Sequence, residues 1–219
     1  MRQAFVSHRG WARNRLAGLL LALTWVAAAP AVALGDSGQK PEDPWDLCRQ
    51  GIAAAERDHQ LPPLLLGAIA KTESGRWHED RAARLAWPWT VMAEGKGRFL
   101  PSKQAAIDMV KALRARGVQN IDVGCMQVNL YHHSDAFEDL EAAFDPQRNA
   151  AYAAGFLAEL RSEARSWTRA VGHYHSRTIL RANAYRAKVF KAWRAERHRA
   201  NRERRARLQA EREAARKKS

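Results

Sequence analysis

The residue in this sequence best placed to do chemistry is Glu73, which follows a short apolar run. Leu65, Ile69 and Glu73 are spaced by four, so a helix would put the carboxyl on the face that packs against the core. Gly75 predicts a left-handed helix end, which leaves Glu73 in the last turn beside the negative end of the helix dipole. Both surroundings disfavour the anion, so we expect a raised pKa and a general acid. The alternative is a frayed end with Glu73 in water.

The elements that must position Glu73 are mostly helices. Capping residues and apolar spacing predict helices over about 44–58, from 64 to Glu73, 102–117 and 145–164, a short helix from 166, and a closing helix through Tyr185, Val189 and Trp193. Segments 87–92 and 97–100 predict one small β-hairpin. The expected fold class is therefore mainly α, with a minor β element.

Several polar and aromatic residues lie between the expected helices. Trp87 and Trp89 could equally pack in the core or stack on sugar rings. Gln127 lies in an apolar stretch, where a buried amide needs partners that a ligand rich in hydroxyls could supply. The adjacent His132 and His133 have no metal-ligand spacing around them, which favours solvated histidines.

The two ends differ in composition from the body of the chain. Residues 1–33 have four arginines, a 14-residue apolar run and a small-x-small site, which is typical of a secretory signal peptide. A Gly/Ser/Pro-rich linker over 34–43 and a domain over 44–193 follow. Residues 194–219 form a basic tail, helical or disordered, whose charge is +7. The signal contributes +4 of the total of +14, so only +3 belongs to the rest, which argues against nucleic acid as a partner.

The sequence contains two cysteines, Cys48 and Cys125. In an exported protein such a pair can form a disulfide, and the alternative is two buried free thiols. Sequence alone does not supply the Cα separation that decides between them. We retain the disulfide as the expectation.

Three separated motifs, in this order, resemble those of a known family. Segments 71–75, 124–129 and 174–176 are similar to the E-S-G, G-L-M-Q and Y-N-A-G motifs of the soluble lytic transglycosylases, which have a goose-type lysozyme fold. Segment 144–157 resembles the family's D-P-x-x-N helix, and the similarity extends from about 45 to 193. The chain departs from the pattern at Cys125, where the family has Leu, and at 175–177, which replace Asn-Ala-Gly.

The resemblance implies roles for six residues. Glu73 would be the catalytic acid, Ser74 would support it through a hydrogen bond, and Tyr174 would reach toward it. Met126 and Gln127 would line the wall of a sugar subsite, and Asn129 would follow that wall. The asparagine role is not transferred, because His175 stands in its place.

The implied substrate is peptidoglycan. Glu73 would protonate the oxygen between N-acetylmuramic acid and N-acetylglucosamine, then take the proton of the C6 hydroxyl as this oxygen closes on C1, giving a 1,6-anhydro end. Ordinary glycosidases use two carboxylates. Asp80 and Asp122 are acids close in sequence to a motif, and neither has a helix register that aims it at Glu73. A mechanism with a single acid avoids this problem.

Two alternatives remain open on the same fold: a true muramidase, and a wall-binding or scaffold protein without turnover. We expect a periplasmic or secreted monomer without metal or cofactor and without a membrane span after signal cleavage. Its expected partners are glycan strands and an envelope-spanning secretion or assembly complex.

Overall fold

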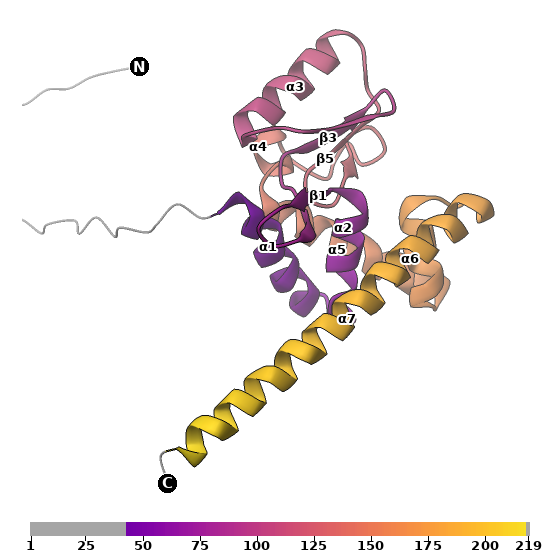
Figure 1. Ribbon diagram of the computed structural model, residues 1–219. Helices are drawn as coiled ribbons and strands as arrows, with labels where there is room; N and C mark the ends of the chain where they lie inside the picture. Colours follow the sequence, from indigo (N-terminus) through magenta and orange to yellow (C-terminus); the bar gives the residue numbers. More distant parts are fainter. Residues whose placement is uncertain (1–42, 218–219) are drawn as a thin grey trace, which may run out of the picture. The chain divides into compact units, whose positions relative to one another are not determined.

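The computed structural model describes residues 43–217, which contain seven helices and six strands (Figure 1). The helices are α1 (Pro44–Asp58), α2 (Leu65–Glu73), α3 (Lys103–Ala115), α4 (Leu140–Ala143), α5 (Pro146–Ala164), α6 (Trp167–His175) and α7 (Ile179–Arg216). The strands are β1 (Gly75–His78), β2 (Ala83–Ala86), β3 (Thr90–Ala93), β4 (Lys96–Phe99), β5 (Ile121–Val123) and β6 (Val128–Asn129). The expected mainly helical class with a minor β part is confirmed. The expected signal peptide over 1–33 lies outside the described residues.

Most helices begin where the sequence indicates. Asp43, Ser102, Asp145 and Ser166 each precede a helix, and each side chain accepts a hydrogen bond from a backbone N–H of the first turn. These bonds satisfy donors that have no partner inside the helix. The predicted starts of α1, α3, α5 and α6 are therefore confirmed.

Helix α2 begins differently, because its cap comes from another helix. The carboxylate of Glu56 in α1 accepts hydrogen bonds from the N–H groups of Leu64, Leu66 and Gly67, at 2.9, 2.8 and 3.2 Å. A negative charge at this position also interacts favourably with the positive end of the α2 dipole. The sequence does not indicate this cap, since a capping carboxylate eight residues before the N-cap residue Leu64 matches no local motif.

The main core lies between the helices. Leu65 and Ile69 of α2 are fully buried, as their spacing predicts. Helix α1 packs chiefly on α5, whose buried face is lined with alanines. Gly51 shows how closely these helices approach, because a Cβ there would lie 2.6 Å from the carbonyl oxygen of Pro146. Small residues on α5 thus permit the close crossing that the sequence predicts.

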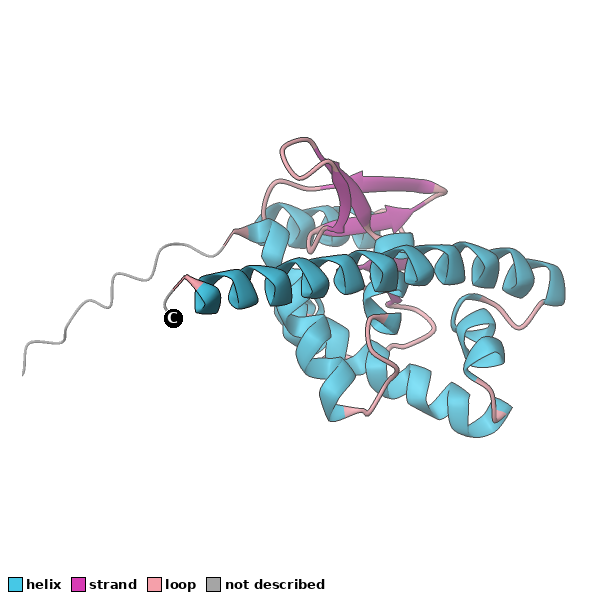
Figure 2. Cartoon of the chain, turned by 60° about the horizontal axis from the view of Figure 1, so that its bottom comes forward, coloured by secondary structure: helices cyan, strands magenta, loops and turns pink. Residues whose placement is uncertain are grey.

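Most of the strands lie on the same side of the long helix α7 (Figure 2), and β3 also packs against α3. The predicted hairpin is confirmed as β3 and β4, in which Thr90 pairs with Phe99. It belongs to an antiparallel sheet of order β4-β3-β5-β6, and β1 pairs with β2 separately. The sequence does not predict β1, β2, β5 or β6, because strands of two to four residues are too short to show a period. The equally short β3 and β4 are recognised from the turn between them, which contains Glu94 and Gly95.

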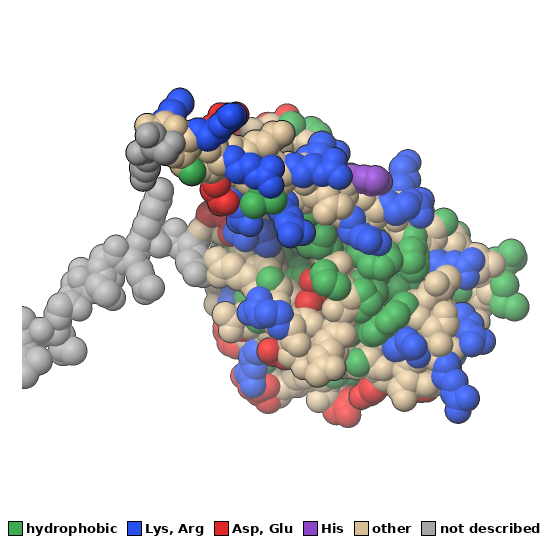
Figure 3. Space-filling model, turned by 90° about the horizontal axis from the view of Figure 1, so that it is seen from below, with side chains coloured by type: hydrophobic (Ala, Val, Ile, Leu, Met, Phe, Trp, Pro, Cys, Tyr) green, Lys and Arg blue, Asp and Glu red, His purple; other side chains and the backbone are tan. Residues whose placement is uncertain are grey.

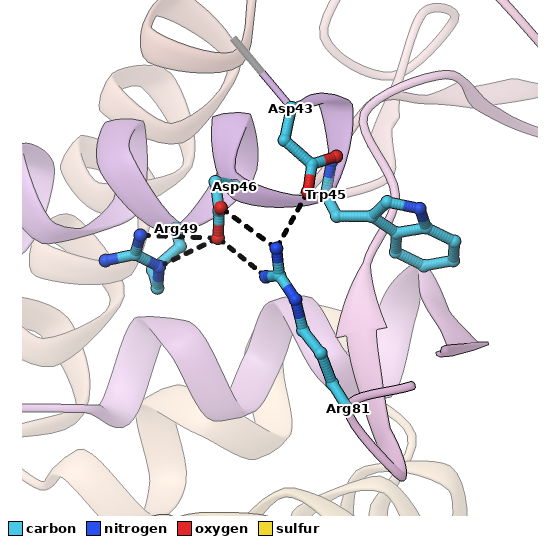
Figure 4. A network of polar contacts seen from close by, with 5 residues as sticks. All are labelled: Asp43, Trp45, Asp46, Arg49 and Arg81. Atoms are coloured by element: carbon cyan, nitrogen blue, oxygen red, sulfur yellow. Dashed lines mark hydrogen bonds and ion pairs between the residues drawn. The ribbon is translucent and has the colours of Figure 1, made fainter. Parts of the chain in front are cut away.

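An exposed cluster of charges links the start of α1 to the turn between β1 and β2 (Figure 4). The guanidinium of Arg81 donates hydrogen bonds to Asp43 at 2.7 Å and to Asp46 at 2.8 and 3.1 Å. The hydrogen bonding from Arg81 holds the pKa of Asp46 below its ordinary value.

Trp87, beside this region, is 5 % exposed and donates a hydrogen bond from Nε1 to the carbonyl of Leu100, so it packs in the core.

Helix α7 continues without a break through residue 193, where the body of the domain was expected to end. The expected basic tail is therefore helical as far as the structure describes it, and its side chains beyond residue 200 are exposed. Lys and Arg side chains are prominent along it (Figure 3). In residues 43–217 we find no helix long and apolar enough to cross a membrane.

The two cysteines form the expected disulfide. Cys48 and Cys125 are both buried, with their Cα atoms 5.7 Å apart and a sequence separation of 77. The bond joins α1 to the turn between β5 and β6. Closing a loop of this length restricts the unfolded chain, so it contributes mainly through the entropy of the unfolded state.

We therefore expect reduction of this disulfide to lower the free energy of unfolding by about 4 kcal/mol, the chain-entropy value for such a loop. Urea unfolding with and without reductant measures this difference in free energy, and the Cys48→Ala/Cys125→Ala protein serves as a second form without the disulfide. An unchanged midpoint after both thiols have been titrated as free would contradict the expectation.

Candidate active site

The end of α2 opens into a pocket of about 350 Å³. Residues from both the helical part and the sheet surround it. They are Glu73, Met92, Asp122, Gln127, Val128, Asn129, His132, His133, Tyr152, Ala153, Phe156, Tyr174 and His175. The pocket thus combines one acid from a helix end, one acid from a strand, three histidines and several aromatic rings.

Glu73 is the last residue of α2 and is half-buried at the pocket wall. Burial raises the pKa of its carboxyl to about 7, against an ordinary value of 4.5. The predicted position and the predicted direction of the pKa shift agree with this geometry. Helix α2 ends at Glu73 as predicted, but the left-handed conformation predicted for Gly75 is wrong, because Gly75 lies in β1 without a positive φ. A glycine is needed there for space, since a Cβ would lie 2.2 Å from the carbonyl oxygen of Lys71.

The side chain that contacts Glu73 is Tyr185 of α7, whose hydroxyl donates a hydrogen bond to Oε1 at 2.5 Å. Tyr185 is 6 % exposed. Its bond stabilises the anion and so opposes part of the rise in the pKa of Glu73. The sequence predicts Tyr185 only as a core residue of the closing helix, because no local pattern relates two residues 112 positions apart.

Asp122 is the second acid of the pocket, and it comes from β5. Asn129 donates a hydrogen bond from Nδ2 to Asp122 Oδ1 at 2.6 Å, which fixes the carboxylate across the strand pair. Burial raises the pKa of Asp122, and its negative charge raises the pKa of Glu73. The expectation that Asp122 is not aimed at the site is wrong, because a strand and not a helix carries it.

The turn between β5 and β6 is held from below by Asn149 of α5, which is fully buried. Its amide donates to the carbonyls of Val123 and Ala143 and accepts from the N–H of Met126 at 2.9 Å. Gly124 has a φ of +81°, and a Cβ there would lie 2.4 Å from Asn149 Nδ2. The turn therefore requires glycine at this position, both for its conformation and for space.

Four of the six residues to which the resemblance gives a role line the pocket, and two do not. Glu73, Gln127, Asn129 and Tyr174 line the pocket. Ser74 does not, because it is fully buried and its hydroxyl donates to the carbonyls of Cys125 and Ala70 instead of Glu73.

Met126 is also fully buried and does not line the pocket, so its side chain belongs to the core. Tyr174 donates its hydroxyl to the carbonyl oxygen of Met126 at 3.0 Å, and not to Glu73. The expected contact between Tyr174 and Glu73 is thus replaced by the one from Tyr185. Gln127 lies in the left-handed region, with a φ of +51°, and donates its amide to the carbonyl of Gly124.

Histidines form the far wall of the pocket. His133 bonds the hydroxyl of Tyr152 at 2.8 Å and packs against the ring of Phe156, so it is less solvated than expected. His175, which stands in the position of the family's asparagine, stacks on Tyr185 with ring centroids 4.6 Å apart. Across residues 43–217 no group of three or more His, Cys, Asp or Glu side chains is arranged to hold a metal ion.

Comparison of the sequence with known proteins and protein families gives one match. A search of curated proteins and a search of solved structures each found no match. The family model described as the transglycosylase SLT domain matches residues 50–202, which include α2, the sheet, α5, α6 and more than half of α7. Because this match covers more than half of the sequence, the chain belongs to the transglycosylase SLT domain family.

Proposed function

We propose that the chain is a peptidoglycan lytic transglycosylase that cleaves the bond between N-acetylmuramic acid and N-acetylglucosamine and leaves 1,6-anhydro ends. Membership of the SLT family supports a transglycosylase in general. The observation that carries the specific proposal is the buried carboxyl of Glu73, whose pKa near 7 keeps a large fraction protonated at neutrality. A general acid works best when its pKa lies near the working pH.

In the proposed reaction, protonated Glu73 gives its proton to the glycosidic oxygen as the bond to C1 breaks. The carboxylate that remains then takes the proton of the C6 hydroxyl, whose oxygen closes on C1. Tyr185 supports this exchange, because its 2.5 Å hydrogen bond holds Glu73 Oε1 in place and stabilises the transient anion. Gln127, Asn129 and Tyr174 would position the sugar from the pocket wall.

Asp122 is the observation that favours a second candidate, a true muramidase. A carboxylate in the same pocket as the acid could activate a water molecule, which would give a reducing end. Asn129 donates a hydrogen bond to Asp122 Oδ1, so this carboxylate is oriented by the protein. The products distinguish the two reactions directly.

We also propose that the chain acts in the periplasm or outside the cell. Residues 1–33 have the pattern of a signal peptide, and the proposed substrate is a wall polymer. Local opening of the wall for an envelope-spanning assembly would suit a domain of this size. Detection of the cleaved mature chain in the periplasm or the medium would test the location.

We expect the wild-type chain to release anhydromuropeptides from purified sacculi, and Glu73→Gln to reduce this release by about a hundredfold or more, since a general acid is typically worth that much. The amide keeps the shape and can still accept the bond from Tyr185. Mass spectrometry of the soluble products measures both the amount and the type of end.

The matched control is Glu79→Gln, which removes an exposed acid from the turn after β1. It should retain wild-type activity. Reducing ends from the wild type would support the muramidase, and binding to sacculi without soluble product would support the wall-binding alternative.

The pH dependence should shift in opposite directions in two variants. Cleavage needs protonated Glu73, so activity should fall as the pH rises through about 7. Tyr185→Phe removes a bond that lowers the pKa of Glu73, so the alkaline limb should move to higher pH. Asp122→Asn removes a charge that raises this pKa, so the limb should move to lower pH. Profiles of kcat/KM on soluble glycan measure these shifts, and equal shifts in the two variants would contradict the assignment.

A further inference from the structure

Helix α7 has two unlike faces. Ala182, Tyr185 and Val189 are buried against the domain, and about two turns further Glu196 forms an ion pair with Lys71 of α2. On the opposite face, basic residues repeat every three, four or seven positions, which places them in one row of the helix surface. We define this row as the basic stripe; it consists of Lys191, Arg194, His198, Arg202, Arg205 and Arg212.

The basic stripe is exposed along its whole length of about 32 Å. None of its residues forms an ion pair with another residue in the described range 43–217. Three of the four glutamates of this part of α7 lie elsewhere: Glu196 and Glu203 are at the side of the domain with Arg199, and Glu211 is near Arg207. The fourth, Glu213, follows Arg212 near the end of the helix. The positive charge is therefore not neutralised within the helix.

Helix α7 begins with two exposed apolar residues, of which Leu180 shares the face of the basic stripe and Ile179 lies about 100° around the helix from it. Ile179 and Leu180 are 74 % and 80 % exposed, the highest values among the large exposed hydrophobic residues of the described chain. Leu180 precedes Lys191 by 11 positions, or about three turns, so it is in line with the basic stripe. Leu208, at the edge of the stripe, is 40 % exposed. Exposed aliphatic side chains at the start of a long cationic face need an explanation besides solubility.

We propose that this face of α7 lies on the surface of a bilayer that contains anionic phospholipids. The basic stripe would contact phosphate headgroups, and Ile179 and Leu180 would enter the boundary between headgroups and acyl chains. The stripe points away from the domain, so a flat surface can meet it along its full length without displacing Tyr185 or Glu196.

Two other kinds of partner, a protein and a nucleic acid or other polyanion, fit these observations less well. A specific protein interface is usually centred on aromatic or other large apolar anchors, and the stripe has none between residues 191 and 205. Nucleic acid or another polyanion would match the arginines, but it would gain nothing from Ile179 and Leu180. Only a bilayer uses both parts of the face.

The test is co-sedimentation of the full chain with phosphatidylcholine vesicles, with and without phosphatidylglycerol, at low and high salt. The stripe variant is Arg202→Gln/Arg205→Gln/Arg212→Gln. Each basic residue near an anionic surface is worth about 1 kcal/mol, so this variant should bind phosphatidylglycerol vesicles roughly a hundredfold more weakly. Ile179→Ser/Leu180→Ser should reduce the binding that remains at high salt.

The matched control removes the same charge from other surfaces, through Arg84→Gln/Arg114→Gln/Arg169→Gln. These three arginines are exposed and belong to β2, α3 and α6. The control should bind anionic vesicles like the wild type. The apolar run at 16–29 is identical in all these proteins, so it does not contribute to the differences between them.

Three results would overturn the proposal: equal binding to neutral and anionic vesicles, equal binding by the stripe variant and the wild type, or binding to polyglutamate or duplex DNA without binding to vesicles. The proposal does not rest on catalysis. Cleavage of soluble glycan by the stripe variant should equal that of the wild type, so a failure of the lyase assignment would be seen separately.

Discussion

The structure depends on keeping one carboxyl group away from water without a counter-ion. Among residues 43–217, no Lys, Arg or His lies within ion-pair distance of Glu73. Its polar neighbours are the hydroxyl of Tyr185 and the like charge of Asp122. An anion in such surroundings is disfavoured, and only one hydrogen bond offsets this. The protonated form therefore persists up to neutral pH, which an exposed glutamate would not allow.

Such a group keeps its position only if the end of α2 cannot move, and the structure fixes this helix at several points. Glu56 binds the N–H groups of its first turn. Lys71 pairs with Glu196 of α7, and the hydroxyl of Ser74 donates to the carbonyl oxygen of Cys125 at 2.6 Å. The disulfide at Cys125 then ties this carbonyl to α1. Local fraying, which would return Glu73 to solvent, requires breaking contacts with three separate elements.

The sequence predicts the features that depend on neighbouring residues. The helix caps, the apolar face of α2, the exposed charge of the tail and the β3–β4 hairpin all follow from local spacing. The position of Glu73 also follows from this spacing, and the resemblance adds the pocket residues Gln127, Asn129 and Tyr174. Contacts across the fold could not be predicted, because nothing in the spacing distinguishes Tyr174 from Tyr185 as the partner of Glu73. Asp122 was misjudged because its strand of three residues is too short to be recognised.

Helix α7 lies between the pocket and the outer surface of the domain. Its geometry determines whether binding at that surface can change the pKa of Glu73. Tyr185 and Glu196 face α2, whereas the basic stripe faces the other way. A ligand on one side changes the pKa of Glu73 only if it binds one position of α7 better than another. A flat anionic surface contacts the stripe whichever way the inner face is packed, so it has no such preference. Attachment would then hold the domain at a surface and leave the acid unaltered, which means that location and catalysis can change independently in this chain.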